Sequence, residues 1–252
     1  GRISSGPLLD EWGSGLAMNF VQSRSMRDTA AMLDCLAIPQ PGDPFIVTKP
    51  LDSYASLLRK PLQPLQVAWS AKPLLDSPVD PEIAASVAAT AQVLASLGHH
   101  VSEDAPPIDL PELDTHLMSS WFYAFDRRLD GYARKTGRQI GPDTLEAATL
   151  RFYEYARGVP HTANLDAIAY FNTFRRMMGA FFSRYDAWVT PTCVVSPPKL
   201  GLYNMNVELP PLEFIAREEK LGQFMSIYNV TGQPAISLPL GMHASGLPIG
   251  VQ

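Results

Sequence analysis

The chain has 252 residues, enough for one large domain or two small ones with a sizeable hydrophobic core, and we expect a single domain spanning residues 1–252. Hydrophobic residues make up 46% and charged residues 18% of the sequence, which excludes intrinsic disorder. The formal net charge is −5 and the basic residues are scattered, so nucleic acid is not an expected partner. No apolar run approaches the roughly 18 residues that a membrane-spanning helix needs, so no membrane partner is expected either.

Two cysteines, Cys35 and Cys193, lie far apart in apolar surroundings. This favours buried free thiols in a reducing compartment over a disulfide, which stays as the alternative. We therefore expect a cytoplasmic protein. The adjacent His99 and His100 lack further ligands at metal-binding spacing, so no metal site is expected.

The first predicted helix follows a glycine- and serine-rich irregular segment over residues 1–24. Ser23 or Ser25 can cap this helix, a helical stripe of apolar residues runs through it, and it ends before Pro39. A packed amphipathic helix explains this segment without any catalytic role.

A unit of α/β type comes next. Residues 39–50 carry four prolines and predict a surface linker, and residues 53–60 predict a short helix. Residues 65–69 predict a strand, residues 80–97 a helix with an aspartate cap, and residues 100–102 a returning strand. This order implies parallel pairing with a right-handed crossover.

Residues 110–185 are predicted to be helical in about three segments, covering residues 113–133, 142–157 and 165–185. A strand follows at residues 186–190 and ends at a proline. Residues 212–227 have a helical pattern in spite of an internal glycine.

The C-terminal stretch predicts a buried hairpin. Its strands are Ala235–Leu240 and Leu247–Val251, and the turn is Ala244–Gly246. Small and amide-bearing residues before the first strand predict a loop that could form a pocket floor: Asn229, Thr231, Gly232 and Gln233. From spacing alone, a sheet corner without chemistry is the alternative.

Four stretches, in sequence order, resemble the amidase signature family. Residues 1–7 resemble the end of its K-P-[ST]-R-G-R-[IV]-S segment, and residues 23–30 its T-R-S-V-R-D-A-A helix start. Residues 185–192 resemble its Y-D-x-[IL]-[LV]-x-P-T strand. Residues 229–252 contain N-x-x-G-Q-P-A-I-S-L-P-L-G-M and G-L-P-I-G-V-Q, which resemble its C-terminal hallmark. Within the family, the motif residues are most similar to those of the branch that contains 6-aminohexanoate cyclic dimer hydrolase.

The resemblance implies an α/β fold with a mixed central sheet covered by helices, truncated here at both ends. It also implies amide hydrolysis without a cofactor, by a serine nucleophile, a second serine in a cis peptide and a lysine base. A buried lysine with a lowered pKa can deprotonate a serine, and backbone amides stabilise the oxyanion. These catalytic residues belong to segments before Gly1, so none is assigned within the chain.

Substrate-binding candidates follow from the same resemblance, which makes residues 110–185 a variable pocket wall. The candidates are Trp121, Thr192, Cys193, Phe224 and Asn229. Plain core packing is the alternative for Trp121, and a structural thiol is the alternative for Cys193. A hidden Ser70–Lys72 pair is disfavoured, because the lysine precedes a proline and should be exposed.

We therefore expect the C-terminal portion of a serine-dependent amidase acting on small linear or cyclic amides, inactive by itself. The apolar composition is compatible with a homodimer. The alternative is a non-catalytic binding or scaffold protein derived from the same fold.

Overall fold

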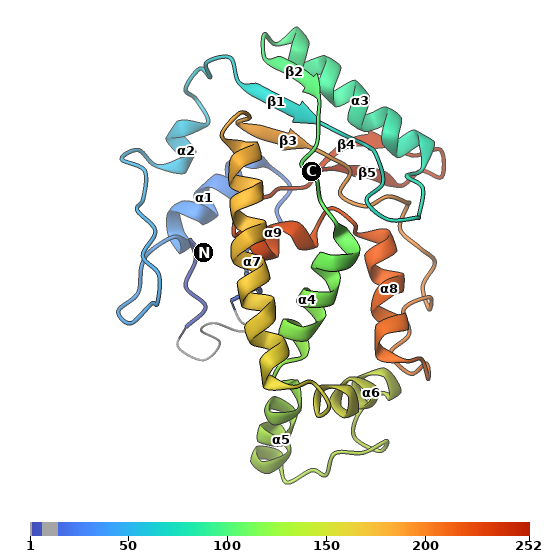
Figure 1. The fold of residues 1–252 in the computed structure, drawn as a ribbon. Helices are drawn as coiled ribbons and strands as arrows, with labels where there is room; N and C mark the ends of the chain where they lie inside the picture. The colour runs from blue at the N-terminus through green and yellow to red at the C-terminus, as the bar shows by residue number, and fades with distance from the viewer. Residues whose placement is uncertain (1, 7–14) are drawn as a thin grey trace. The chain divides into compact units, whose positions relative to one another are not determined.

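The computed structural model of the chain describes residues 2–6 and 15–252, and Figure 1 shows its helices and strands. The chain divides into two compact units, Gly1–Gln63 and Pro64–Gln252. Parts of the predicted N-terminal irregular segment, residue 1 and residues 7–14, lie outside the described residues.

The described residues of the first unit include two helices, α1 (Met26–Leu36) and α2 (Tyr54–Leu57). The Oγ of Ser25 accepts the backbone N–H of Asp28 at 3.1 Å, which confirms the predicted cap of α1. Asp34 on α1 accepts the backbone N–H groups of Tyr54 and Ala55. One carboxylate therefore fixes the start of α2 against α1.

The second unit is built on a three-stranded parallel sheet with the order β2-β1-β3. The strands are β1 (Gln66–Trp69), β2 (His100–Glu103) and β3 (Ala187–Val189). Helix α3 (Pro81–Ser96) connects β1 to β2 and starts at an aspartate cap. The predicted strand, helix, strand unit with parallel pairing is therefore confirmed.

Two further strands, β4 (Leu238–Met242) and β5 (Pro248–Val251), form the predicted antiparallel hairpin. The chain beyond β3 pairs with β5 in the antiparallel sense: Thr190 and Gln252 exchange backbone hydrogen bonds of 3.0 and 2.8 Å. The parallel and antiparallel parts are thus joined, and the mixed α/β architecture expected from the sequence is confirmed.

Burial of the hairpin differs from the prediction. Ile249 and Val251 of β5 are buried, but Leu240 and Met242 of β4 are 52% and 67% exposed. The prediction that both strands are core is therefore wrong for β4. The reason is topological: β5 has a neighbour on each side, whereas β4 pairs with β5 alone among the described strands.

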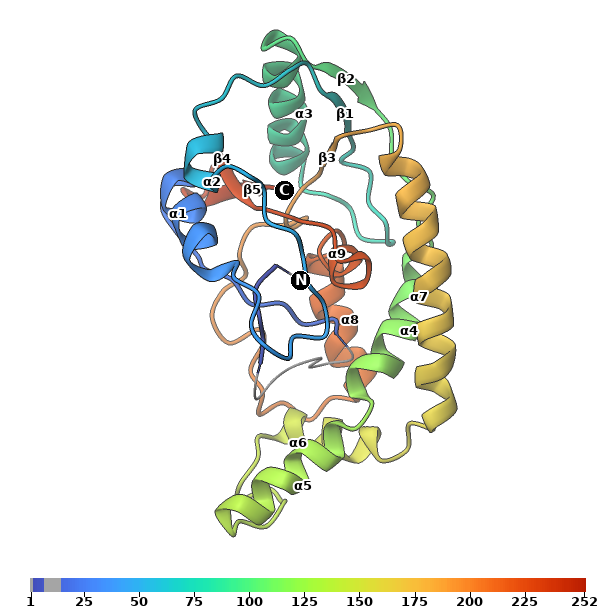
Figure 2. The same cartoon turned by 90° about the vertical axis from the view of Figure 1, so that its left-hand side faces the viewer.

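Four helices fill residues 110–182, namely α4 (Leu110–Phe122), α5 (Phe125–Thr136), α6 (Ala147–Ala156) and α7 (His161–Phe182). The single helix predicted for residues 113–133 is wrong, because Ala124 has a left-handed φ of 58° that separates α4 from α5. Figures 1 and 2 show α7 beside α4, with α5 and α6 at the end away from β1–β3. Among the described helices, none combines the length and apolar character needed to cross a membrane.

The helix predicted for residues 212–227 is also two helices, α8 (Pro211–Leu221) and α9 (Ser226–Thr231). Gly222 ends α8, and a Cβ at this position would require the terminal methyl of Met225, 2.4 Å away, to move. Asn229 and Thr231, predicted in a loop, are in α9.

A buried amide clamp holds the turn between α8 and α9 to the loop after β1. The Gln223 side chain is 1% exposed, and its Oε1 accepts the backbone N–H groups of Leu74 and Leu75. Its Nε2 donates to the carbonyl oxygens of Ser77 and Lys220. All four contacts use the two ends of one amide, so the clamp needs a donor and an acceptor on the same side chain.

The backbone at Gly250 is crowded by two hydroxyl groups. A Cβ at Gly250 would lie 2.9 Å from the Oγ of Ser237 and 2.9 Å from the Oγ1 of Thr192. Those two oxygens are themselves hydrogen-bonded at 2.6 Å. The side chains therefore fill the space that any larger residue at position 250 would require.

Replacing Gln223 with glutamate tests the amide clamp. Gln223→Glu keeps the acceptor but loses both donors and places a carboxylate against two carbonyl oxygens, so we expect the free energy of unfolding to fall by about 3 kcal/mol. Denaturant unfolding of both proteins measures this loss. The same change at exposed Gln92 on α3 should have little effect, and an equal loss at the two positions would contradict the clamp.

Replacing Gly250 with alanine tests the crowding at β5. Because the added methyl has no space, we expect Gly250→Ala to destabilise the fold by about 1–3 kcal/mol. Gly179 in α7 has open space around its Cβ position, so Gly179→Ala should instead stabilise the protein by about 0.5–1 kcal/mol. Thermal unfolding of the two variants would refute this explanation if both changed stability in the same direction.

Candidate functional site

Thr192 and Cys193 lie where the chain leaves β3. The backbone N–H of Thr192 donates to the carbonyl of Gly250 at 3.1 Å, and its hydroxyl bonds the hydroxyl of Ser237. We call the antiparallel pairing of residues 190–192 with residues 250–252 the joint between β3 and β5. This joint fixes both the backbone and the side chain of Thr192. Its hydroxyl faces the hairpin, where Ser237 was not anticipated as a partner.

Cys193 directly follows Thr192 and is half-buried. Burial raises the pKa of its thiol, which keeps the sulfur protonated near neutral pH and makes it a poor nucleophile. The following residue, Val194, is held on both sides, because its N–H donates to Leu221 and its carbonyl accepts from Asp80. The chain on the C-terminal side of Cys193 is therefore fixed by backbone hydrogen bonds.

Phe224 is fully buried between α8 and α9. Its ring meets Trp188 of β3 edge-on, with 6.1 Å between ring centroids. Its carbonyl accepts a hydrogen bond of 3.2 Å from the side-chain amide of Gln252, which also reaches the hydroxyl of Thr190. Gln252 thus links Phe224 to the strand that leads to Thr192. Sequence reasoning did not predict this role, because Gln252 only follows an apolar run.

Asn229 occupies α9 and is half-buried. Its neighbours Ile227 and Val230 are buried, and the Val230 carbonyl accepts a 2.6 Å hydrogen bond from the Nε of Arg175 on α7. Helix α9 is therefore anchored to α7, and this anchor sets the position of Asn229.

Trp121 lies near the C-terminal end of α4, in a different hydrophobic cluster from Phe224. This cluster has Phe122, Phe152 and Phe214 among its buried members, and Trp121 packs against it. The structure therefore brings Thr192, Cys193 and Phe224 to one joint and places Trp121 among the helices.

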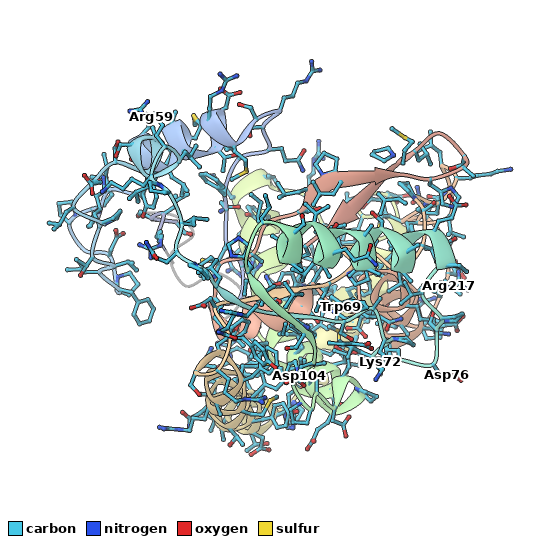
Figure 3. All side chains as sticks on the ribbon, turned by 90° about the horizontal axis from the view of Figure 1, so that it is seen from above. Arg59, Trp69, Lys72, Asp76, Asp104 and Arg217 are labelled. Carbon is cyan, nitrogen blue, oxygen red and sulfur yellow. The ribbon has the colours of Figure 1, made fainter. Side chains whose placement is uncertain are left out.

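The one serine and lysine pair suggested by spacing is not assembled. Ser70 is buried, and its Oγ accepts the backbone N–H of Lys72. The Lys72 side chain is 80% exposed, and its Nζ lies 3.9 Å from Glu103, as it extends from the loop after β1 (Figure 3). This outcome agrees with the expectation that Ser70 and Lys72 are not catalytic.

A small hollow of about 80 Å³ lies within the first unit and includes Ser4 and Ser5 in its lining. The Ser4 hydroxyl donates to Asp43 at 2.6 Å, and this bond lowers the pKa of the Asp43 carboxyl. Arg2, also in the lining, donates to the hydroxyl of Tyr54. A serine bonded to a carboxylate and lacking a lysine or histidine among the described lining residues has no base of the expected kind.

Sequence reasoning missed two acidic side chains away from solvent, Asp114 on α4 and Glu219 on α8; burial raises the pKa of both carboxyl groups, that of Glu219 to about 8. Both sit on the apolar stripes of their helices, four residues after Leu110 and Ile215 respectively. An acidic residue on a buried stripe was the available signal. Across residues 2–6 and 15–252, no group of three or more potential ligands could hold a metal ion.

Comparisons with known proteins identify the family and the fold. The amidase family model matches residues 1–252. The chain is 31% identical to the 6-aminohexanoate-cyclic-dimer hydrolase of Paenarthrobacter ureafaciens and 30% identical to a putative amidase of Mycobacterium bovis. All of the chain aligns in both cases, against 53% and 51% of those proteins.

A solved structure of 6-aminohexanoate cyclic dimer hydrolase in complex with substrate is also similar. It superposes with a TM-score of 0.90 at 29% identity, over 100% of this chain and 54% of that one. The chain therefore spans about half the length of the relatives that it matches. Because the family match covers its whole length, the chain belongs to the amidase family.

Proposed function

We propose that residues 1–252 form the C-terminal, substrate-facing portion of a serine-dependent amidase that hydrolyses small linear or cyclic carboxamides. The observation that carries this proposal is the likeness, over the whole chain, to 6-aminohexanoate cyclic dimer hydrolase. That likeness covers about half of the relative, so the reactive serine, cis-serine and lysine are proposed to belong to the rest of the protein.

The joint between β3 and β5 supports this role. It holds Thr192 and Cys193 on a fixed backbone, and the side chain of Gln252 links this backbone to the buried Phe224. A site that positions a substrate needs such a rigid support. We assign Thr192 and Asn229 to hydrogen bonding with the amide group of the substrate. Cys193 and Phe224 are assigned to the apolar surface that determines the shape of the pocket. Trp121 and the helices of residues 110–185 form a separate wall that can set substrate size.

Exposed apolar groups on β4 support a larger assembly. Leu240 and Met242 lie on a strand with one described partner, whereas the opposite edge strand, β2, carries His100, Ser102 and Glu103. Polar edge residues discourage further strand pairing and apolar ones permit it. The β4 edge is therefore the side on which the remainder of an amidase would add to the sheet.

Amide hydrolysis by the full gene product that contains residues 1–252 tests the proposed reaction. A panel should include cyclic and linear 6-aminohexanoate dimers, aliphatic amides and aryl amides, with product amine measured over time. We expect turnover of at least one class by the full product and none by residues 1–252 alone, because the nucleophile and base are proposed to lie in the rest of the protein. A full product that binds these amides without hydrolysing any would favour the non-catalytic alternative.

Alkylation of the two cysteines tests whether the reaction could depend on a thiol. Since burial raises the pKa of Cys193 whereas Cys35 is exposed, we expect iodoacetamide at neutral pH to modify Cys35 at least about tenfold faster. Peptide mass spectrometry of the folded protein gives both rates, and unfolding in denaturant should equalise them. Faster reaction at Cys193 in the folded protein would indicate an activated thiol and would count against a serine mechanism.

A further inference from the structure

Ser237 brings a second hydroxyl group to Thr192 from another part of the chain. It directly precedes β4, and its Oγ lies 2.6 Å from the Oγ1 of Thr192. The two residues are 45 positions apart in the sequence. The joint between β3 and β5 therefore brings the two hydroxyl groups together, and local geometry does not.

The hydroxyl pair lies on the face of the hairpin opposite to α3. Side chains alternate along a strand, so position 250 points away from its neighbour Val251. Val251 is buried and packs in one cluster with Val87 of α3. A Cβ at Gly250 would lie 2.9 Å from each hydroxyl oxygen, so both oxygens adjoin the other face. On that face Ser237 is exposed and Thr192 is half-buried.

The pair keeps a proton that it can donate to a ligand. A bond between two hydroxyl groups uses one donor and one acceptor, and the group that accepts keeps its own proton for another partner. No second hydrogen-bond partner of either hydroxyl group lies among the described residues. A hydroxyl group that accepts a hydrogen bond is also a better donor, because hydrogen bonds in a chain polarise one another.

We propose that Ser237 is a positioning residue of the substrate site: its hydroxyl group donates to the Oγ1 of Thr192 and so directs the Thr192 proton at the carbonyl oxygen of the substrate amide. This inference rests on the proposed function, in which Thr192 bonds the amide group of the substrate. In the reverse direction, the Thr192 proton would be engaged by Ser237. Gly250 belongs to the arrangement, because a side chain there would occupy the place of both hydroxyl groups.

Steady-state kinetics of Ser237→Ala, made in the full gene product that contains residues 1–252, tests this role. We expect KM for the hydrolysed amides to rise at least about fivefold, as the loss of one hydrogen bond predicts, while kcat changes less than about twofold. Ser237→Thr keeps the hydroxyl group and should restore KM to within about twofold of the unmodified protein. A KM that stays the same or falls in Ser237→Ala would overturn the proposal, because Thr192 would then bind the substrate without help from Ser237.

Two further variants separate positioning from a general loss of structure. Ser245, an exposed serine of the same hairpin, bonds His243 instead, so Ser245→Ala should keep the KM of the unmodified protein. Thr192→Val should raise KM at least as much as Ser237→Ala, and the double variant should raise it no further, because the two hydroxyl groups act through one another. If the effects of the two single variants multiply in the double variant, the hydroxyl groups act independently and the proposal is wrong.

Direct binding separates failure of this proposal from failure of the proposed function. If the full product hydrolyses none of the amides, the proposed function fails, and isothermal titration with the cyclic and linear 6-aminohexanoate dimers tests the pair instead. Binding that Ser237→Ala weakens at least about fivefold and Ser237→Thr restores would support the pair. Turnover with the same KM in all three proteins would overturn the pair and leave the proposed function standing. Absence of both turnover and binding would overturn both.

Discussion

The antiparallel pairing of residues 190–192 with residues 250–252 is the constraint on which the second unit depends. It joins a parallel sheet, formed by β1, β2 and β3, to a hairpin that would otherwise hold only its own two strands. An isolated two-stranded hairpin is at best marginally stable in water, so the joint makes the hairpin part of a sheet. The same pairing leaves β4 at an edge, which explains why half of the hairpin is exposed.

Side chains extend this joint toward the helices. Gln252 reaches from the end of β5 to the carbonyl of Phe224, and Gln223, one residue earlier, clamps the loop after β1. Two amides therefore tie the turn between α8 and α9 to the end of β5 and to the loop after β1. Amides suit this position because each supplies a donor and an acceptor without a charge that burial would penalise. The chain around Thr192 and Phe224 is consequently determined by backbone and amide contacts together.

The helices of residues 110–182 are held by different contacts. Helix α4 packs along α7, and a buried hydrogen bond between Ser120 and Asn164 fixes their relative position. Trp121 adjoins this bond in the sequence, yet it packs with α6 and α8 rather than with the joint. The two parts are nevertheless linked, because α7 packs against α9 and Arg175 of α7 donates a hydrogen bond to the carbonyl of Val230. The helices of residues 110–182 and the strands are therefore held as one packed body.

Local signals were sufficient for some elements and not for others. Ser25 and Asp80 cap helices through contacts within three residues, so the sequence alone identified both helix starts. The parallel β1 and β2 pair followed from the order of its elements. In contrast, the break at Ala124 requires a left-handed backbone, which alanine does not favour. Tertiary packing of the flanking helices α4 and α5 must impose this conformation. The exposure of β4 depends on which strands are neighbours, and periodicity does not encode that.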